Sequence, residues 1–186
     1  MKNAIPDKNF KSYESLTGES VDVPNLSPSD HGWSRWDDTM KTFECYNCDF
    51  NILAIDGGEE DCIDLGTHTT LCSFRNGLLM GGGSRYLFTI KSHSEDNTFE
   101  DFHVMEHAKW CDIQLGNWSD QDNRSNGGNR FYDWTTADCK PVTYSYRLFS
   151  GSRPEFVGMQ ARHLWWLSVG MTIYFWVKWL VRKIFY

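Results

Sequence analysis

Residues 60–76 read EDCIDLGTHTTLCSFRN, and they contain two short runs in which apolar and polar side chains alternate. Ile63 and Leu65 are the apolar positions of the first run, and Cys72 and Phe74 are those of the second. Such alternation is typical of a β-strand that has one side buried. The stretch therefore predicts two short strands joined by a turn.

The same arrangement recurs along the chain. Leu65, Ile90 and Leu115 are each 25 residues apart. Segments that end in an aromatic residue accompany them at 48–50, 72–74, 100–102 and 132–134. A unit of this size cannot bury its own apolar side chains, whereas stacked units give every strand a parallel partner. We expect two inward ladders, one of Phe50, Phe74, Phe102 and Trp134 and one of Leu65, Ile90, Leu115 and Tyr144.

This organisation resembles the right-handed parallel β-helix of pectate-lyase-like enzymes and viral tailspike proteins. Residues 60–65, 70–76 and 109–117 carry the resemblance, which covers about residues 42–150. It implies a mainly β protein with a short right-handed parallel β-helix of about four coils, and it supports a fold and not an activity. Short alternating strands also permit an antiparallel sandwich, which is the alternative.

Composition divides the chain into four parts. Residues 1–41 are predicted to be a polar N-terminal arm, in which 30–36 caps the first coil. Residues 42–150 form the β-helix domain, and 151–162 are a linker whose Gly and Pro end any strand. Residues 163–186 are predicted to be a hydrophobic α-helix.

The C-terminal segment has a different charge from the rest of the chain. All 25 Asp and Glu lie within residues 1–155, whereas residues 163–186 carry only basic charge and four Trp. As a helix, residues 164–181 would be roughly 27 Å long, close to the roughly 30 Å of a hydrocarbon core. Aromatic and basic residues at such ends are typical of a membrane anchor. The expected anchor residues are Leu164, Trp165, Trp166, Tyr174, Phe175, Trp176, Lys178, Trp179, Arg182 and Lys183.

Two alternatives remain for this helix. It could lie in the membrane plane, although Trp165, Phe175 and Trp179 interrupt the polar arc that such a helix needs. It could also be buried in an assembly. The N-terminus lacks a basic region followed by an apolar run, so we expect no secretory signal and a membrane location through this single C-terminal anchor.

Six Cys without an expected secretory signal favour reduced, buried thiols. Cys45 and Cys48 have the spacing of a zinc or redox pair, but no second such pair completes a four-ligand site. We therefore expect no cofactor and structural thiols, with a metal site at Cys45 and Cys48 as the weaker interpretation.

Carboxylates form the candidate catalytic set. Enzymes that cleave polysaccharides need an acid and a base on either side of the scissile bond. Asp61, Asp64 and Asp112 could supply them, because Asp64 and Gln114 occupy equivalent outward positions two coils apart. Thr89 interrupts this array, so solvated strand positions are the preferred interpretation.

Two further features of the sequence are candidate sites. His103 and His107 flank Glu106 but lack the order of a helical zinc motif, so turn or surface histidines are expected. Trp118 lies in a polar loop and could stack on a sugar, which makes it the candidate ligand-binding residue.

Together these features predict a non-enzymatic, membrane-anchored structural or attachment protein. The resemblance implies a bacteriophage virion component, located in a virion membrane, as one version. The alternative is a membrane-tethered protein that binds or cleaves carbohydrate. Expected partners are a lipid bilayer and other subunits or copies of the chain, since the open ends of a short solenoid need cover. A net charge of −7 without a basic patch outside the tail argues against nucleic acid.

Overall fold

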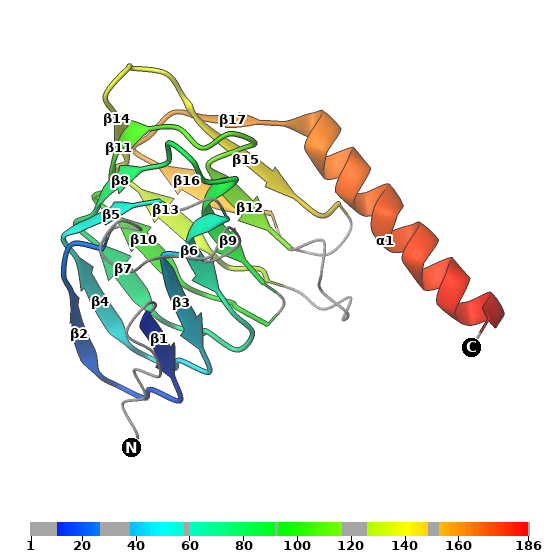
Figure 1. Ribbon diagram of the computed structural model, residues 1–186, viewed down its shortest axis with the longest axis horizontal. Coiled ribbons are helices and arrows are strands. Elements are labelled where there is room, and N and C mark those ends of the chain that lie inside the picture. The colour runs from blue at the N-terminus through cyan, green and yellow to red at the C-terminus, as the bar shows by residue number, and fades with distance from the viewer. Residues whose placement is uncertain are drawn as a thin grey trace.

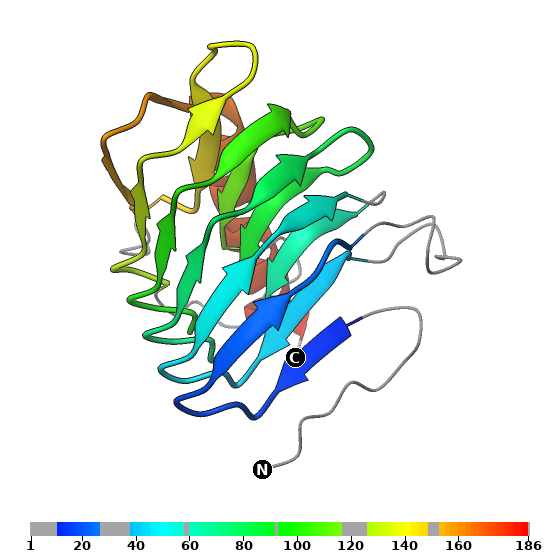
Figure 2. The ribbon, with the colours of Figure 1, turned by 90° about the vertical axis from the view of Figure 1, so that its left-hand side faces the viewer.

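The computed structural model describes residues 11–26, 38–57, 60–91, 93–116, 126–148 and 153–185. These residues form a parallel β-solenoid that continues into a C-terminal helix, α1 (Trp165–Phe185) (Figure 1). Three sheets run along the solenoid, and each turn of the chain adds at most one strand to each sheet (Figure 2). The described strand pairs are all parallel, so the solenoid prediction is confirmed and the sandwich alternative is wrong.

The strands of the three sheets are as follows. The first sheet contains β1 (Lys11–Glu14), β3 (Met40–Phe43), β6 (Asp61–Leu65), β9 (Tyr86–Ile90), β12 (Ile113–Leu115), β15 (Val142–Tyr146) and β17 (Ala161–His163). The second contains β2 (Ser20–Val23), β4 (Asp49–Ile52), β7 (Ser73–Arg75), β10 (Thr98–Glu100), β13 (Arg130–Tyr132) and β16 (Glu155–Val157). The third contains β5 (Ala54–Asp56), β8 (Leu78–Met80), β11 (His103–Glu106) and β14 (Thr135–Thr136). Four coils therefore contribute to all three sheets, in agreement with the expected number.

The solenoid extends beyond the predicted boundaries at both ends. Residues 11–26 were expected in an arm, but β1 pairs with β3 and β2 pairs with β4. Leu16 and Val23 are buried there, so this short, mostly polar stretch supplies enough inward side chains for a partial coil. The predicted cap at 30–36 lies outside the described residues. At the other end, β16 and β17 occupy positions assigned to the linker and the start of the anchor.

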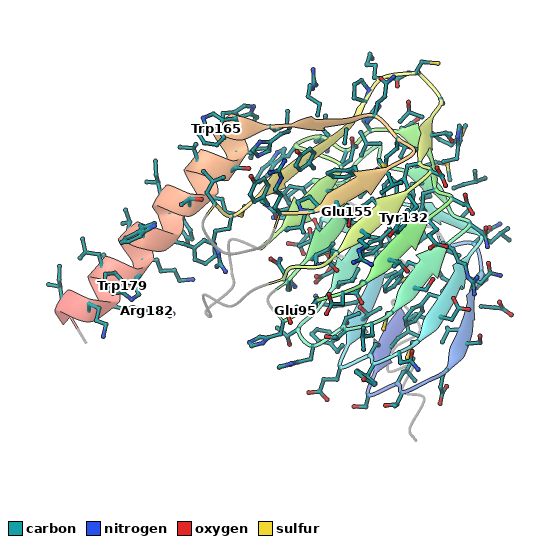
Figure 3. The ribbon with its side chains drawn as sticks, turned by 180° about the vertical axis from the view of Figure 1, so that it is seen from behind. Glu95, Tyr132, Glu155, Trp165, Trp179 and Arg182 are labelled. Carbon is teal, nitrogen blue, oxygen red and sulfur yellow. The ribbon has the colours of Figure 1, made fainter. Side chains whose placement is uncertain are left out.

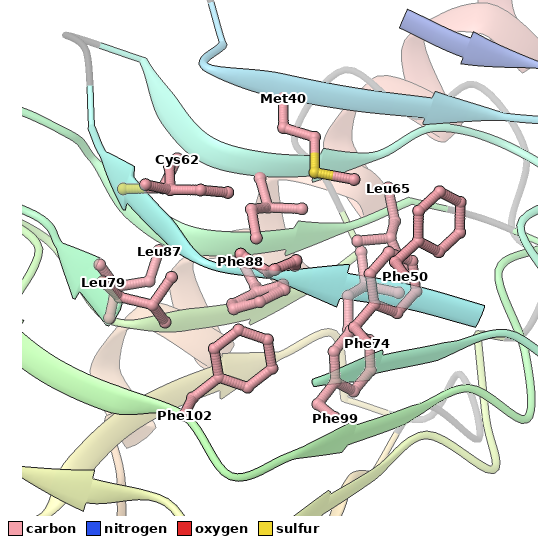
Figure 4. Close-up of a cluster of buried hydrophobic side chains, with 14 of the residues drawn as sticks. Met40, Phe50, Cys62, Leu65, Phe74, Leu79, Leu87, Phe88, Phe99 and Phe102 are labelled. Atoms are coloured by element: carbon pink, nitrogen blue, oxygen red, sulfur yellow. The ribbon is translucent and has the colours of Figure 1, made fainter. Parts of the chain in front are cut away.

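A stack of phenylalanine rings runs through the core. Phe50, Phe74, Phe99, Phe131 and Phe156 follow one another with ring centroids 4.6–5.2 Å apart. The predicted ladder is right for its first two members, which lie beside Phe99 in the core (Figure 4). It is wrong for Phe102 and Trp134, which pack against each other at 5.0 Å and against Phe88.

The aliphatic ladder follows the prediction more closely. Leu65, Ile90 and Leu115 are paired in register, so the 25-residue step reports true stacking. The next member is Tyr146, whereas the predicted Tyr144 pairs with Ile113. An offset of two residues leaves the side chain on the same side of the strand, and alternation by itself does not distinguish the two tyrosines.

Helix α1 is held by the solenoid along its N-terminal half and then leaves it (Figures 1 and 3). Leu167 and Met171 are buried against the solenoid. Among the described residues, no helix combines the length and the apolarity that crossing a bilayer requires, which corrects the expected membrane span. Much of the apolar surface of α1 comes from Trp and Tyr, whose polar ring groups favour an interface over a hydrocarbon interior.

Candidate functional site

The exposed surface of α1 concentrates apolar side chains. Seventeen large apolar side chains are exposed in the described part of the chain, and ten of them lie on this helix. They include Trp166, Ile173, Trp176, Val177 and Ile184, each more than half exposed. Scattered apolar side chains are normal on a protein surface, but such a concentration on one element makes α1 the candidate interaction surface.

One side of α1 contacts the solenoid along the N-terminal half of the helix. The backbone N–H of Tyr146 donates to Ser168 Oγ at 3.0 Å, and the N–H of Leu148 donates to Thr172 Oγ1 at 2.9 Å. Both acceptors are buried. Because backbone groups of the strand and side chains of the helix bond directly, α1 is fixed to β15 and is not a flexible tether.

The opposite side of α1 carries an apolar stripe. We use this name for Trp166, Ile173, Val177, Leu180 and Ile184, which are spaced by three, four or seven residues. At 3.6 residues per turn, this spacing places them in one line along the helix. Ser168, Met171, Thr172 and Phe175 lie on the side that faces the solenoid, so the stripe points away from it.

The exposed surface of α1 is more amphipathic than its sequence suggests. The solenoid covers part of the polar side of the helix, including an aromatic residue that interrupts the polar arc. The guanidinium of Arg147 lies 4.6 Å from the centre of the Phe175 ring, which removes this side chain from the polar arc. In the free half, Lys178, Arg182 and Lys183 lie outside the apolar stripe. Trp165 and Trp179 remain exposed (Figure 3).

Two of the three predicted carboxylates belong to one cluster. Asp64 accepts from Lys41 Nζ at 2.8 Å and also from Lys91, and Lys41 contacts Asp38 at 2.9 Å. Asp61 belongs to the same group of charges, and its carboxylate raises the pKa of Asp38. Asp38 was not foreseen as a member, because it precedes its strand and had no signal in the repeat.

These buried carboxylates differ in protonation. Burial and the neighbouring Asp64 carboxylate raise the pKa of Asp38 to about 8 and that of Asp61 to about 7. Burial opposes ionisation of Asp64 as well, but the Lys91 and Lys41 ammonium groups hold its pKa below the ordinary value. Unequal carboxylates can serve acid–base chemistry, but Asp61 and Asp64 are only 2% and 1% exposed. The cluster therefore has the properties of a buried network of ion pairs that links neighbouring coils.

Asp112, the third predicted carboxylate, does not join this cluster by any hydrogen bond or ion pair among the described residues. It is fully buried and accepts from the N–H groups of Ala108 and Thr143 at 3.0 and 2.8 Å. Its Oδ2 lies 2.8 Å from His107 Nδ1, and this hydrogen bond raises the pKa of the imidazole. Asp112 thus closes the turn before β12 and holds His107.

The cysteine pair lies in the core of the solenoid. Cys45 and Cys48 are buried, and their thiols donate to the backbone oxygens of Tyr13 and Tyr46 at 3.0 and 3.5 Å. Burial raises the pKa of Cys45 to about 12, which disfavours the thiolate that binds zinc. Within the described ranges no group of His, Cys, Asp and Glu has metal-binding geometry. Trp118, the predicted ligand-binding residue, lies outside these ranges.

An open cavity of about 470 Å³ lies where the third sheet ends at β14. Its polar lining is largely used internally, since Thr136 Oγ1 donates to the Lys140 carbonyl at 2.8 Å and Lys140 Nζ lies 2.7 Å from Asp138. Few polar groups are left to orient a ligand there.

Comparison of the chain with protein-family models, curated proteins and solved structures gives no match. The parallel solenoid of the structure supports the resemblance to pectate-lyase-like and tailspike proteins in its general fold alone.

Proposed function

We propose that this protein is a non-enzymatic attachment module, in which α1 lies in the plane of a membrane surface and carries the solenoid. The observation that carries the proposal is the orientation of the apolar stripe. It points away from the solenoid, so a flat surface can cover it without meeting the solenoid.

The residues of the stripe and its neighbours suit a lipid interface. Trp166, Tyr174, Trp176 and Trp179 provide rings that combine apolar area with a polar N–H or O–H, and such rings favour the boundary between headgroups and acyl chains. Helices that lie in this boundary expose an apolar face with Trp and Leu and carry Lys and Arg elsewhere. The in-plane alternative from the sequence is thus the version we adopt, in place of a spanning anchor.

A catalytic role receives less support. Asp61 and Asp64 are buried and ion-paired, and no substrate bond can lie between them without displacing these partners. Carbohydrate binding, a place in a virion and association with other subunits stay predictions, since no described contact favours them.

Vesicle co-sedimentation of the full chain tests the proposal. The double variant Ile173→Glu/Val177→Glu places two charges in the stripe, and we expect its binding to fall at least tenfold, because each exposed apolar side chain contributes about 1.5–3 kcal/mol when fully buried. The matched control is Leu53→Glu/Leu78→Glu, which alters two exposed solenoid residues in the same way. Equal binding by the stripe variant and the control would contradict the proposal.

A further inference from the structure

We propose that the surface bound by α1 is anionic phospholipid, recognised by Lys178 and Lys183, while the acidic solenoid is held on the opposite side of the helix. This inference rests on the proposed attachment function and names the lipid class. It follows from where charge lies on the chain and from how α1 is fixed.

The basic residues of α1 are not paired with carboxylates in the part of the chain that the structure describes. Solenoid cations are extensively paired: Lys41, Arg75, Arg85, Lys91, Arg130 and Lys140 all contact carboxylates. By contrast, Lys178, Arg182 and Lys183 form no ion pair with any described residue, and the helix contains no Asp or Glu. Unpaired cations on an apolar helix are complementary to phosphate and carboxylate headgroups.

Two of the three cations can reach headgroups while the stripe is buried. Lys178 and Lys183 lie roughly 100–120° from the centre of the stripe, on opposite flanks. Their long apolar stems can lie along the interface with the ammonium groups extended into the headgroup layer. The Lys178 ammonium already lies 5.8 Å from the Tyr174 ring centre. Arg182 follows one turn after Lys178 but lies roughly 160–170° from the centre of the stripe, on the side of the helix that carries Phe175. It adds positive charge near the end of the helix without direct contact with the headgroups.

The acidic solenoid would oppose such binding if it touched the membrane. All 25 Asp and Glu lie within residues 1–155, and the whole chain carries −7. The solenoid packs on the side of α1 opposite to the stripe, so its acidic groups lie about one helix diameter, roughly 10–12 Å, from the stripe. Salt with a Debye length of about 8 Å weakens the repulsion of these more distant carboxylates more than it weakens the direct contacts of the α1 lysines with the headgroups.

The separation depends on rigid attachment. Ser168 and Thr172 bond to the backbone of β15 and its continuation, Met171 is buried, and Phe175 packs under Arg147. These contacts extend over more than one turn of helix and leave no hinge between the solenoid and the lipid-facing half.

Binding of the full chain to two kinds of vesicle tests the inference: phosphatidylcholine alone, and phosphatidylcholine mixed with phosphatidylserine. We expect the anionic lipid to raise the affinity of the wild type up to about thirtyfold, at about 1 kcal/mol for each of the two flanking lysines near the surface. The variant Lys178→Gln/Arg182→Gln/Lys183→Gln should lose this gain and keep its weaker binding to phosphatidylcholine. The matched control Arg75→Gln/Arg130→Gln/Lys140→Gln removes three exposed solenoid cations and should keep the gain.

The outcomes separate the two proposals. Equal binding of the wild type to both vesicles overturns the anionic preference and leaves attachment intact. Absence of binding to either vesicle overturns both. A stable dimer in light scattering without lipid, abolished by Ile173→Glu/Val177→Glu, assigns the stripe to a second copy of the chain and also overturns both.

Discussion

The guanidinium of Arg147 lies 4.6 Å from the centre of the Phe175 ring, and this contact joins the end of the last long strand to the middle of the helix. Arg147 is nearly fully buried, so the cation faces the ring in a largely desolvated position. Cation–π pairs of this kind contribute up to about 2 kcal/mol. The contact marks the point at which α1 leaves the solenoid, and it therefore controls how firmly the free half is held.

Phe175→Ala should loosen this half of the helix. We expect faster amide hydrogen exchange from residue 173 onward, by a factor that corresponds to about 1–2 kcal/mol, and unchanged exchange in the solenoid strands. Trp176→Ala is the matched control, because Trp176 is 64% exposed. Uniformly faster exchange in both variants would show that the helix is not held at Phe175.

The carboxylate cluster makes stability depend on pH. The folded-state pKa values of Asp38 and Asp61 are raised to about 8 and about 7, well above their values in the unfolded chain. At pH values between the unfolded pKa of about 4 and these folded-state values, the folded protein binds more protons than the unfolded chain. The contribution of Asp38 and Asp61 to stability is therefore complete below pH 4 and is lost as the pH rises through 7 and 8. Asp64 has a lowered pKa, and its own contribution is lost only in acid.

Urea denaturation should therefore show a free energy of unfolding that falls by at least about 1 kcal/mol between pH 5 and pH 9. Asp61→Asn should flatten this dependence, since the amide does not titrate. A free energy of unfolding that rises over the same interval would contradict the raised pKa values.

The phenylalanine stack should be sensitive at its centre. Phe99 stacks on Phe74 and Phe131 and is completely buried, so Phe99→Ala should lower the free energy of unfolding by about 3–5 kcal/mol. Leu78→Ala is the control, because Leu78 is 44% exposed and its truncation should change stability by less than about 0.5 kcal/mol. Similar losses in the two variants would argue against the assigned register.

The cysteines differ in accessibility. Five of the six thiols are buried and Cys139 is exposed. An aromatic disulfide reagent should therefore titrate one thiol rapidly in the folded protein and all six after unfolding. A chelator should leave the melting temperature unchanged. Rapid reaction of Cys45 or Cys48, or loss of stability with the chelator, would support the metal-site interpretation.

Part of the candidate site was visible in the sequence. The apolar, aromatic and basic character of residues 163–186 follows from composition, as does the helix itself. The sequence also placed Phe175 within a polar arc, and this argued against an in-plane helix. The packing of Phe175 against Arg147 removes one of the three residues that interrupt this arc, whereas Trp165 and Trp179 stay exposed. Only the tertiary structure shows this contact, because the two residues are 28 positions apart in the chain.

In the core, too, the sequence predicted some of the stacked residues, and only the structure identified the others. The 25-residue step determined that Leu65, Ile90 and Leu115 stack, because a repeated coil returns equivalent residues to equivalent places. Phe99 and Phe102 are both aromatic and lie in one coil, so composition cannot choose between them. The pairing of Thr98 with Ser73, followed by a turn at Asp101 with φ of 56°, selects Phe99 for the stack.

By itself the sequence determined a coiled stack of short strands and a basic, aromatic helix, since both follow from local period and composition. The tertiary structure decided where the coils begin and end, which carboxylates share one cluster and which side of α1 is left uncovered. These features depend on strand register and on contacts between distant segments. No local pattern encodes them, because they arise only when the coils are stacked and the helix packs on their edge.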